Sequence, residues 1–453
     1  MNFLCKIGIK KIFLLLKNKI ISNYELTKCC LNNLIKINKK NNFIIDFFYK
    51  ESLNFAKQLD NKKTFAIPIS LKNIFSIKNK KLTSNSNILK KHNSKYNSDI
   101  VKILKINNFN ILSIDLLDEF CLGSDGINNL NLKNLFNKKN IIGGSSTGSC
   151  LNISYGCNLL SLGSDTGGSS RTPSSFSNII GFKPTNGIFT RNGMIPYSSF
   201  LDNCSIITNY AEDCKFLFNI LRYKNLDLFS NIKKTFINFK KKKKILILNY
   251  KEFFSSNELK IIFEKIIKNF EELNFNIINE NINFCSFLNL YNSISSKDFF
   301  SNTCKFDGIK YGFNNFFYKN INDFIKLNRI FSKDCKNKII KGNNFFIFKK
   351  NFNILEIKKI EKIFQNCFEK SNFILLPTNL DIFEKKNNIY SEYVDLFTMI
   401  SNILGFPTIN LRIGFINHSP IGFQIICNKN NDLDLLELSI LYESFNFKNY
   451  VFN

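Results

Sequence analysis

The chain has no tryptophan and only two histidines among its 453 residues. His92 and His418 both lie in polar, loop-like sequence, away from the one stretch that is rich in glycine and serine. A Ser-His-Asp triad requires a histidine base held by a carboxylate, and neither histidine has those surroundings. The scarcity of histidine also argues against a catalytic zinc site, so we expect no metal in this chain.

Long apolar runs are missing as well. No run approaches the ~20 apolar residues that a membrane-spanning helix requires. The apolar run 12–16 is shorter than the core of a signal peptide and has no small-residue cleavage site after it, so we expect it to be part of a helix. The 13 cysteines, including the pair Cys29-Cys30, follow neither zinc-ligand nor disulfide-framework spacing. We therefore expect a soluble, cytoplasmic protein with reduced thiols and no membrane partner.

Acidic residues are few, and the 63 basic residues against 35 acidic ones give a net charge of +28. Such a charge usually indicates a nucleic-acid or acidic-surface partner. The abundance of Lys, Asn, Ile, Phe and Tyr, however, resembles the output of an AT-rich genome, so the charge gives only weak support for an RNA partner. The lysine run 240–244 directly precedes the apolar run 245–248, and we interpret it as a charged turn that enters a strand.

Apolar periodicity predicts an α/β protein. Residues 1–60 are expected to be helical, with Ser22 and Glu25 at the spacing of a capping box, and 78–98 to be loop. The alternation of short buried strands with helices favours a sheet with helices on its faces. The expected strands are 65–71, 110–116, 245–248, 373–377, 407–411 and 421–426, and the expected helices are 100–106, 211–221, 395–405 and most of 251–370.

Glycine, serine and threonine are concentrated in residues 141–187, which contain two Gly-Gly-Ser triplets ending at Ser145 and Ser169. Backbone amides beside glycine are unhindered and could converge on an oxyanion. The alternative for each triplet is a plain turn. Neither triplet is followed by Gly-Lys-Ser/Thr, which excludes a phosphate-binding loop of that type.

If the serines are reactive, the base is expected to be a lysine, because no histidine is suitable. Lys72 ends the apolar run 65–71, where burial would lower a lysine pKa enough to give some neutral amine. The alternative is a solvated lysine at the rim of a strand. Two Gly-Gly-Ser triplets together with a lysine at a strand end favour acyl-transfer chemistry over that alternative.

Five motifs make the sequence similar to the amidase signature family, and the similarity extends to P-I-G-F-Q-I-I near the C-terminus. The resemblance implies a central mixed β-sheet covered by helices on both faces. It also implies an N-terminal helical segment (1–60), a catalytic core (61–230) and a C-terminal part with substrate-binding helices (231–453). The motifs are P-I-S-L-K (68–72), D-E-F (118–120), G-G-S-S-T-G-S (143–149), L-G-S-D-T-G-G-S-S-R (162–171) and G-F-K-P-T-N-G (181–187).

The resemblance implies a Ser-cis-Ser-Lys triad. By motif, Ser169 would be the acylated nucleophile, Ser145 would lie in a cis peptide and shuttle the proton, and Lys72 would be the final base. The amides of Thr166, Gly167 and Gly168, with that of Ser169, would form the oxyanion hole.

Within the family, the chain resembles the glutamine-hydrolysing members that work in tRNA-dependent amidotransferases, partly through F-D-G-I-K-Y-G (306–312). By this resemblance Asp395 would bind the α-ammonium group of glutamine, with Tyr291 beside it. Lys338 stands where arginine is expected, so it keeps a positive charge but loses the bidentate fork. Two smaller departures are Asn73 in place of aspartate and Thr147 in place of glycine.

The resemblance also implies partners. Ammonia would pass to a B subunit that uses ATP and Mg²⁺ to convert Glu-tRNA(Gln) to Gln-tRNA(Gln), and a small C subunit would hold the two together. This chain itself would need no cofactor. The alternatives are a stand-alone amidase for another small amide, and a non-catalytic scaffold or RNA-binding protein, against which the intact Lys72, Ser145 and Ser169 argue.

Overall fold

The computed structural model of the chain describes residues 4–124, 126, 132–222, 243–249, 253–254, 256–312, 319–347, 354–382, 384 and 394–451. Within these residues, eleven strands form one mixed sheet in the order β1-β3-β2-β4-β6-β5-β10-β11-β9-β7-β8. The strands are β1 (Ile44–Phe47), β2 (Ile67–Lys72), β3 (Phe109–Asp115), β4 (Leu160–Asp165), β5 (Ile180–Lys183), β6 (Asn203–Thr208), β7 (Lys244–Leu248), β8 (Asn276–Glu280), β9 (Phe373–Pro377), β10 (Thr408–Ile416) and β11 (Ser419–Cys427).

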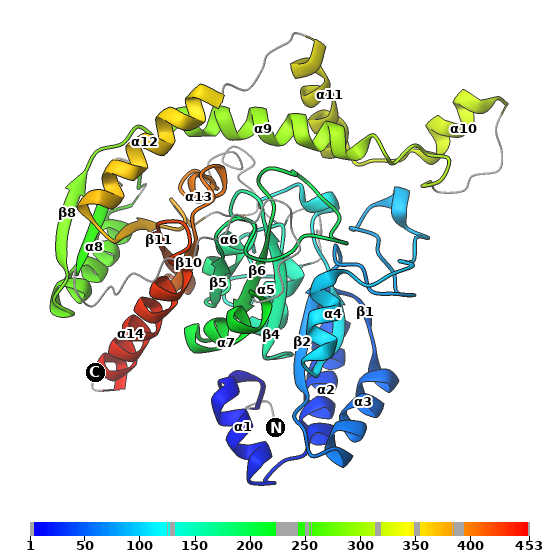
Figure 1. Cartoon of the computed structure of the whole chain (residues 1–453), viewed down its shortest axis with the longest axis horizontal. Coiled ribbons are helices and arrows are strands. Elements are labelled where there is room, and N and C mark those ends of the chain that lie inside the picture. Colours follow the sequence, from blue (N-terminus) through cyan, green and yellow to red (C-terminus); the bar gives the residue numbers. More distant parts are fainter. Residues whose placement is uncertain are drawn as a thin grey trace.

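The sheet is parallel in two places, at β3-β2-β4 and at β9-β7-β8, and antiparallel elsewhere. Helices surround it, and the long helix α9 runs across the top of the view in Figure 1, with α12 near one end of it and α10 and α11 towards the other. The α-helices are α1 (Ile9–Lys17), α2 (Asn23–Asn41), α3 (Tyr49–Asn61), α4 (Asp99–Ile106), α5 (Thr147–Ser154), α6 (Arg171–Phe176), α7 (Ala211–Leu221), α8 (Asn257–Glu272), α9 (Cys285–Thr303), α10 (Ile321–Asn328), α11 (Lys333–Ile347), α12 (Ile354–Lys370), α13 (Met399–Ile403) and α14 (Asp432–Val451).

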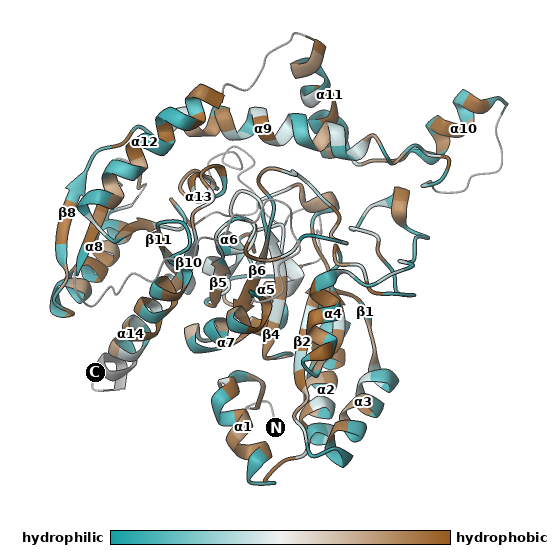
Figure 2. Cartoon of the chain, viewed as in Figure 1, coloured by the Kyte–Doolittle hydropathy of each residue, from teal (hydrophilic) through white to brown (hydrophobic). Residues whose placement is uncertain are grey.

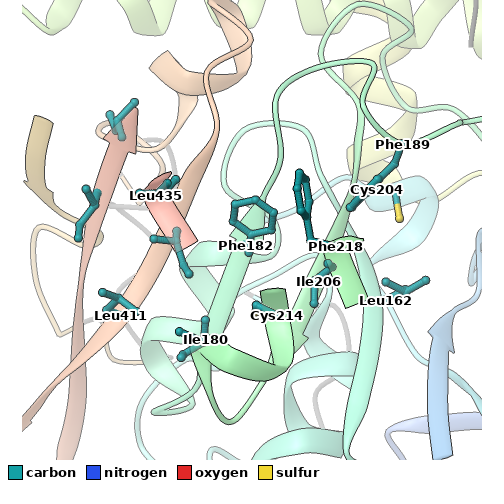
Figure 3. Packing of buried hydrophobic residues seen from close by; sticks show 14 of the residues in the cluster. Leu162, Ile180, Phe182, Phe189, Cys204, Ile206, Cys214, Phe218, Leu411 and Leu435 are labelled. Atoms are coloured by element: carbon teal, nitrogen blue, oxygen red, sulfur yellow. The ribbon is translucent and has the colours of Figure 1, made fainter. Parts of the chain in front are cut away.

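Strand β5 shows how the two faces of the sheet differ. Successive side chains of a strand point to opposite faces. Phe182 packs edge-on against Phe218 of α7 at 5.7 Å between ring centroids, and Figure 3 shows these rings beside Ile206 and Cys214. A methyl group added at the neighbouring Gly181 would instead lie 2.6 Å from Ser174 Oγ of α6. Helices α7 and α6 therefore cover opposite faces, which confirms the expected architecture of a mixed sheet between helical layers.

Glycine allows helices α5 and α6 to approach their face of the sheet closely. At Gly163 of β4, an added methyl group would lie 2.8 Å from Ser146 Oγ, and at Gly422 of β11 it would lie 2.8 Å from Ser175 Oγ. Real side chains essentially never meet atoms at such distances, so any larger residue would push α5 or α6 away from the sheet. This close packing places both Gly-Gly-Ser triplets over the centre of the sheet.

The expected elements agree well with the structure. The capping box is present, since Ser22 and Glu25 exchange hydrogen bonds at the start of α2. The region 251–370 is mostly helix, and α8 and α12 are amphipathic, as their alternating colours in Figure 2 show. Of the lysine run, only Lys243 and Lys244 lie in the described residues, and Lys244 begins β7.

Two expectations were wrong in detail, and the strand β8 was not expected. Residues 1–60 are not wholly helical, because 44–47 form β1, and 251–370 include the strand β8. Both strands lie at the edges of the sheet, where partial exposure weakens the apolar alternation that identifies a strand. The helix expected over 395–405 is shortened to α13, because 394–398 form a turn that carries Asp395.

No helix in the described residues is both long and apolar enough to span a lipid bilayer. The described cysteines form no disulfide among themselves, and Cys304 is the one of them that is exposed.

Candidate active site

Lys72 lies at the end of β2, between two parallel neighbours in the part of the sheet where every residue of the strand is buried. Its side chain is fully buried. The ammonium nitrogen Nζ lies 2.8 Å from Ser145 Oγ, 3.0 Å from Ser146 Oγ and 2.8 Å from Ser164 Oγ. The predicted base is therefore in direct contact with the predicted proton shuttle.

The first triplet forms a tight turn before α5. The peptide bond between Gly144 and Ser145 is cis. A methyl group at Gly144 would lie 2.1 Å from Asp118 Oδ2, so the D-E-F motif lies directly against this turn. Ser146, the next residue, donates a hydrogen bond to the Ser164 carbonyl at 3.0 Å, which attaches the turn to the end of β4.

The second triplet connects β4 to α6. The Ser146 amide donates to the Ser169 carbonyl at 3.0 Å, and this bond brings the two triplets together. Ser169 is 5% exposed, so the predicted nucleophile is almost enclosed. Lys72, Ser145 and Ser169 are thus assembled from three separate elements within one buried region.

A buried ion pair closes the nucleophile loop. Arg171 donates from Nε to Asp165 Oδ2 at 3.0 Å and from Nη2 to Asp165 Oδ1 at 2.9 Å, and both side chains are fully buried. Burial alone would raise the pKa of Asp165, but the Arg171 charge and its hydrogen bonds hold that pKa below its ordinary value. The remaining guanidinium hydrogens bind Ser401, Asn402 and Gln424.

The loop between Asp165 and Arg171 has backbone amides without a hydrogen-bond partner in the part of the chain that the structure describes. Among the described residues, no acceptor is hydrogen-bonded to the amides of Gly167, Gly168 or Ser169. Thr398 Oγ1 donates to the Gly167 carbonyl at 2.5 Å, and Thr166 Oγ1 donates to Asp202 Oδ1 at 2.6 Å. The Gly167 carbonyl and the Thr166 side chain are thus fixed by hydrogen bonds to Thr398 and Asp202. The amides of the loop remain available to an oxyanion.

Tyr291 and Asp395 both reach this loop because it consists of glycine. A methyl group at Gly167 would lie 2.4 Å from the Tyr291 hydroxyl, and one at Gly168 would lie 2.8 Å from Asp395 Oδ1. Gly168 also has φ +143°, a conformation that other residues rarely adopt. The two predicted substrate-binding groups therefore lie directly against the predicted oxyanion hole.

The Asp395 carboxylate is held on both oxygens. Thr172 Oγ1 donates to Oδ1 at 2.9 Å, and Ser124 Oγ donates to Oδ2. Burial raises the pKa of Asp395 to about 6, and these two hydrogen bonds oppose the rise. At neutral pH the group is an oriented anion, which suits it to bind a cation.

Lys338 lies on α11, and its Nζ donates to Ser295 Oγ at 2.9 Å. Ser295 is on α9, one helical turn after Tyr291, so both project from the same face of that helix. Lys338 thereby supplies positive charge one turn away from the tyrosine that contacts Gly167.

Sequence reasoning missed several supporting residues. Ser146 and Ser164 complete the contacts of Lys72, while Asp202 and Thr398 hold the loop of the second triplet. Ser146 could have been noticed, because it directly follows Ser145 in the same motif. Ser164 could also have been noticed, because it lies in the motif 162–171, whereas Asp202 and Thr398 come from distant positions and have no local signature. The two histidines lie elsewhere, His92 against Tyr311 and His418 in the turn between β10 and β11.

Comparisons with known proteins show the family of the chain. The sequence model of the family described as Amidase matches residues 25–436. The chain is 30% identical over 470 residues to the A subunit of glutamyl-tRNA(Gln) amidotransferase from Clostridium botulinum (strain Loch Maree / Type A3), with 95% of each protein covered. It is likewise 30% identical over 464 residues to the first of the A subunits of this enzyme from Clostridium acetobutylicum, again with 95% of each covered.

Solved structures share the fold. A crystal structure of an amidase matches with a TM-score of 0.82 at 18% identity and covers 97% of this chain and 99% of that one. The crystal structure of the glutamyl-tRNA(Gln) amidotransferase A subunit from Thermotoga maritima matches with a TM-score of 0.75 at 23% identity and covers 96% and 93%, respectively. The similarity therefore extends over essentially the whole length of both chains.

Proposed function

The chain belongs to the amidase family, and we propose that it is the glutamine-hydrolysing subunit of a tRNA-dependent amidotransferase. The observation that supports this most strongly is the buried contact of Lys72 with Ser145, beside a glycine loop that lies against Tyr291 and Asp395. This arrangement combines the parts needed for amide hydrolysis with a carboxylate suited to an amino-acid substrate. The similarity to curated subunits with this role favours glutamine as that substrate.

The first chemical step transfers an acyl group to Ser169. Ser145 gives its proton to the neutral amine of Lys72 and takes the proton of Ser169, whose oxygen attacks the side-chain carbonyl carbon of glutamine. For this step Ser145 must donate its hydrogen bond to the neutral amine of Lys72. The two hydrogens of that amine are then donated to Ser146 and Ser164. The carbonyl oxygen becomes an oxyanion that the amides of the second triplet stabilise.

The second step releases ammonia. The proton held by Lys72 returns through Ser145 to the departing nitrogen, the C–N bond breaks, and an acyl-enzyme ester remains on Ser169. Water then attacks the ester, with the same relay as base, and releases glutamate. The sum is glutamine plus water giving glutamate plus ammonia.

Substrate orientation follows from the charges around the loop. Asp395 would pair with the α-ammonium group, and Lys338 would attract the α-carboxylate from the side of α9. Lysine offers a point charge where arginine would offer a bidentate fork, so we expect weaker binding of glutamine than an arginine would provide.

The ammonia would be used outside this chain. We propose that it reaches a B subunit, which activates Glu-tRNA(Gln) with ATP and Mg²⁺ and forms Gln-tRNA(Gln), and that a C subunit joins the complex. The names of the curated relatives, which are subunits of such an enzyme, support these partners.

The test is to co-express the chain with the B and C subunits and to measure ammonia release and glutamine-dependent formation of Gln-tRNA(Gln) with ATP and Mg²⁺. Ser169→Ala should abolish both activities, whereas Ser444→Ala, an exposed serine on α14, should leave both unchanged. Wild-type ammonia release by Ser169→Ala would refute the mechanism. Hydrolysis of other small amides without a partner, and no activity on glutamine, would instead support a stand-alone amidase.

A further inference from the structure

Asp115, at the end of β3, is a fully buried carboxylate that the reaction described above does not use. Five hydrogen bonds converge on it, and all five donors are neutral. They are Ser70 Oγ (2.7 Å), Ser149 Oγ (3.0 Å) and Ser161 Oγ (3.0 Å) on Oδ2, with Asn152 Nδ2 (2.9 Å) and Ser113 Oγ (3.2 Å) on Oδ1.

The position of Asp115 relates it directly to Lys72. Strands β2 and β3 are parallel neighbours, and Lys72 and Asp115 are paired in their register. The amide that follows Lys72, that of Asn73, donates to the Asp115 carbonyl at 3.1 Å. Adjacent strands lie about 4.8 Å apart, so the two residues are next to each other at the end of the sheet.

Helix α5 and strand β4 connect the two groups. Ser145 and Ser146 precede α5 and contact Lys72, while Ser149 within α5 contacts Asp115. In the same way, Ser164 of β4 contacts Lys72 and Ser161 of β4 contacts Asp115. The hydroxyl groups that contact the ammonium and those that contact the carboxylate thus come from the same two segments, although no hydroxyl group in the described residues contacts both.

Each charge lacks a direct counter-ion among its contacts in the described part of the chain. A buried ion is costly unless an opposite charge compensates it. The other groups near Lys72 are the thiols of Cys121 and Cys150 and the carboxylate of Asp118, which lies against Gly144. Burial raises the pKa of Cys150 to about 12, so that thiol stays neutral. Asp165 is already paired with Arg171.

We propose that Asp115 is a positioning residue for Lys72, whose ammonium form the carboxylate charge stabilises from the neighbouring strand. This inference rests on the proposed function, in which Lys72 becomes charged when it takes the proton of Ser145. The positive charge that Lys72 gains with the proton equals the negative charge of the new oxyanion, so the step needs no further reactant. Asp115 occupies the register position next to Lys72 on the neighbouring strand, so its charge lowers the energy of the charged intermediate.

The state of Asp115 itself is compatible with this role. Burial raises its pKa to about 6, and the hydrogen bonds from Ser70, Asn152, Ser149 and Ser161 oppose the rise. At neutral pH the carboxylate is therefore charged when Lys72 accepts its proton.

The test compares Asp115→Asn with the wild type in the full chain assembled with its B and C subunits. Ammonia release from glutamine is measured across about pH 5 to 10, and kcat and kcat/KM are plotted separately. Loss of the negative charge should lower the plateau of kcat about tenfold or more. It should also move the acidic limb of kcat to lower pH by about one unit or more, because the protonated form of the base is then less favoured. The limb of kcat is used because Asp395, whose pKa is about 6, also contributes to the acidic limb of kcat/KM.

Asp213→Asn is the matched control, since Asp213 is also buried but accepts a hydrogen bond from the Ile9 amide far from Lys72. It should leave the acidic limb in place. A lower kcat with an unmoved limb in Asp115→Asn would overturn the inference, since a purely structural role predicts that result.

If Asp115→Asn does not fold, Ser161→Ala tests the effect of the Asp115 charge instead. Removing this donor raises the pKa of Asp115, so the limb should move in the same direction by a smaller amount, and an unmoved limb again overturns the inference. The proposed function fails separately, if Ser169→Ala leaves the wild-type rate intact.

Discussion

Replacing Arg171 by methionine should strongly destabilise the protein, and the loss should depend on pH. In the structure Arg171 makes two hydrogen bonds to Asp165 and one each to Ser401, Asn402 and Gln424. Methionine fills much of the same volume but leaves the Asp165 carboxylate buried without its cation. Breaking one side of a buried ion pair costs about 3–5 kcal/mol, so we expect that loss in the free energy of unfolding at pH 7.

The sign of the pH dependence follows from Asp165. In the wild type its pKa lies below the ordinary value, so its contribution to stability is present above about pH 4 and is lost as the pH falls further. In Arg171→Met, only the Lys183 charge and the hydrogen bonds from Ser170 and Asn402 still oppose the effect of burial, so that pKa rises. The variant therefore loses stability as the pH rises above about 4, by up to about 1.4 kcal/mol per pH unit.

Urea unfolding followed by far-ultraviolet circular dichroism at pH 5 and pH 8 measures this difference, and it suits a chain without tryptophan. The gap between wild type and Arg171→Met should be wider at pH 8. The double variant Asp165→Asn/Arg171→Met should recover most of the loss, because the Asp165 charge is removed together with its partner. A gap below about 1 kcal/mol at pH 7, or an equal gap at both pH values, would refute the reasoning.

Three further predictions concern the site. Gly168→Ala should reduce kcat for ammonia release by about 100-fold or more, because the added methyl group displaces Asp395 and Thr398 and strains a residue at φ +143°; a rate within a factor of two of wild type would contradict this. Lys338→Arg should lower KM for glutamine about three- to tenfold by restoring a bidentate contact, with Lys338→Met raising it; equal KM values would show that Lys338 does not bind the substrate. Asp395 must be ionised to hold an ammonium group, and its pKa is about 6, so kcat/KM should fall as the pH drops below that value. In Asp395→Asn this dependence should disappear from the initial-rate profile.

Local patterns were sufficient to predict the strand and the two turns that carry the candidate site. The apolar run ending in Lys72 predicts a buried strand, and β2 ends at that residue. The doubled Gly-Gly-Ser pattern predicts two tight turns, and the structure brings them together through Ser146 and Ser169. These features were accessible because each depends on only a few consecutive residues.

The contacts between elements could not be predicted in this way. The environment of Lys72 depends on the register of β2 against β4, which brings in Ser164, and on the depth at which α5 sits over the sheet. Asp115 gave no signal, since an aspartate at the end of a strand is usually a solvated residue. The turn that carries Asp395 was mistaken for helix because its apolar spacing, taken alone, is also helical.

The glycines that face α5 and α6 have a consequence for how such a sequence can evolve. Most of the 19 glycines lie between 123 and 193, while the rest of the chain is dominated by lysine, asparagine, isoleucine and phenylalanine. A mutational pressure towards AT-rich codons can replace residues wherever a larger side chain still fits. At Gly163, Gly181 and Gly422 it does not fit, because helix and sheet are already in contact. The short distance between helix and sheet therefore limits compositional drift at these positions, which lie in the same layer as the serines proposed to react.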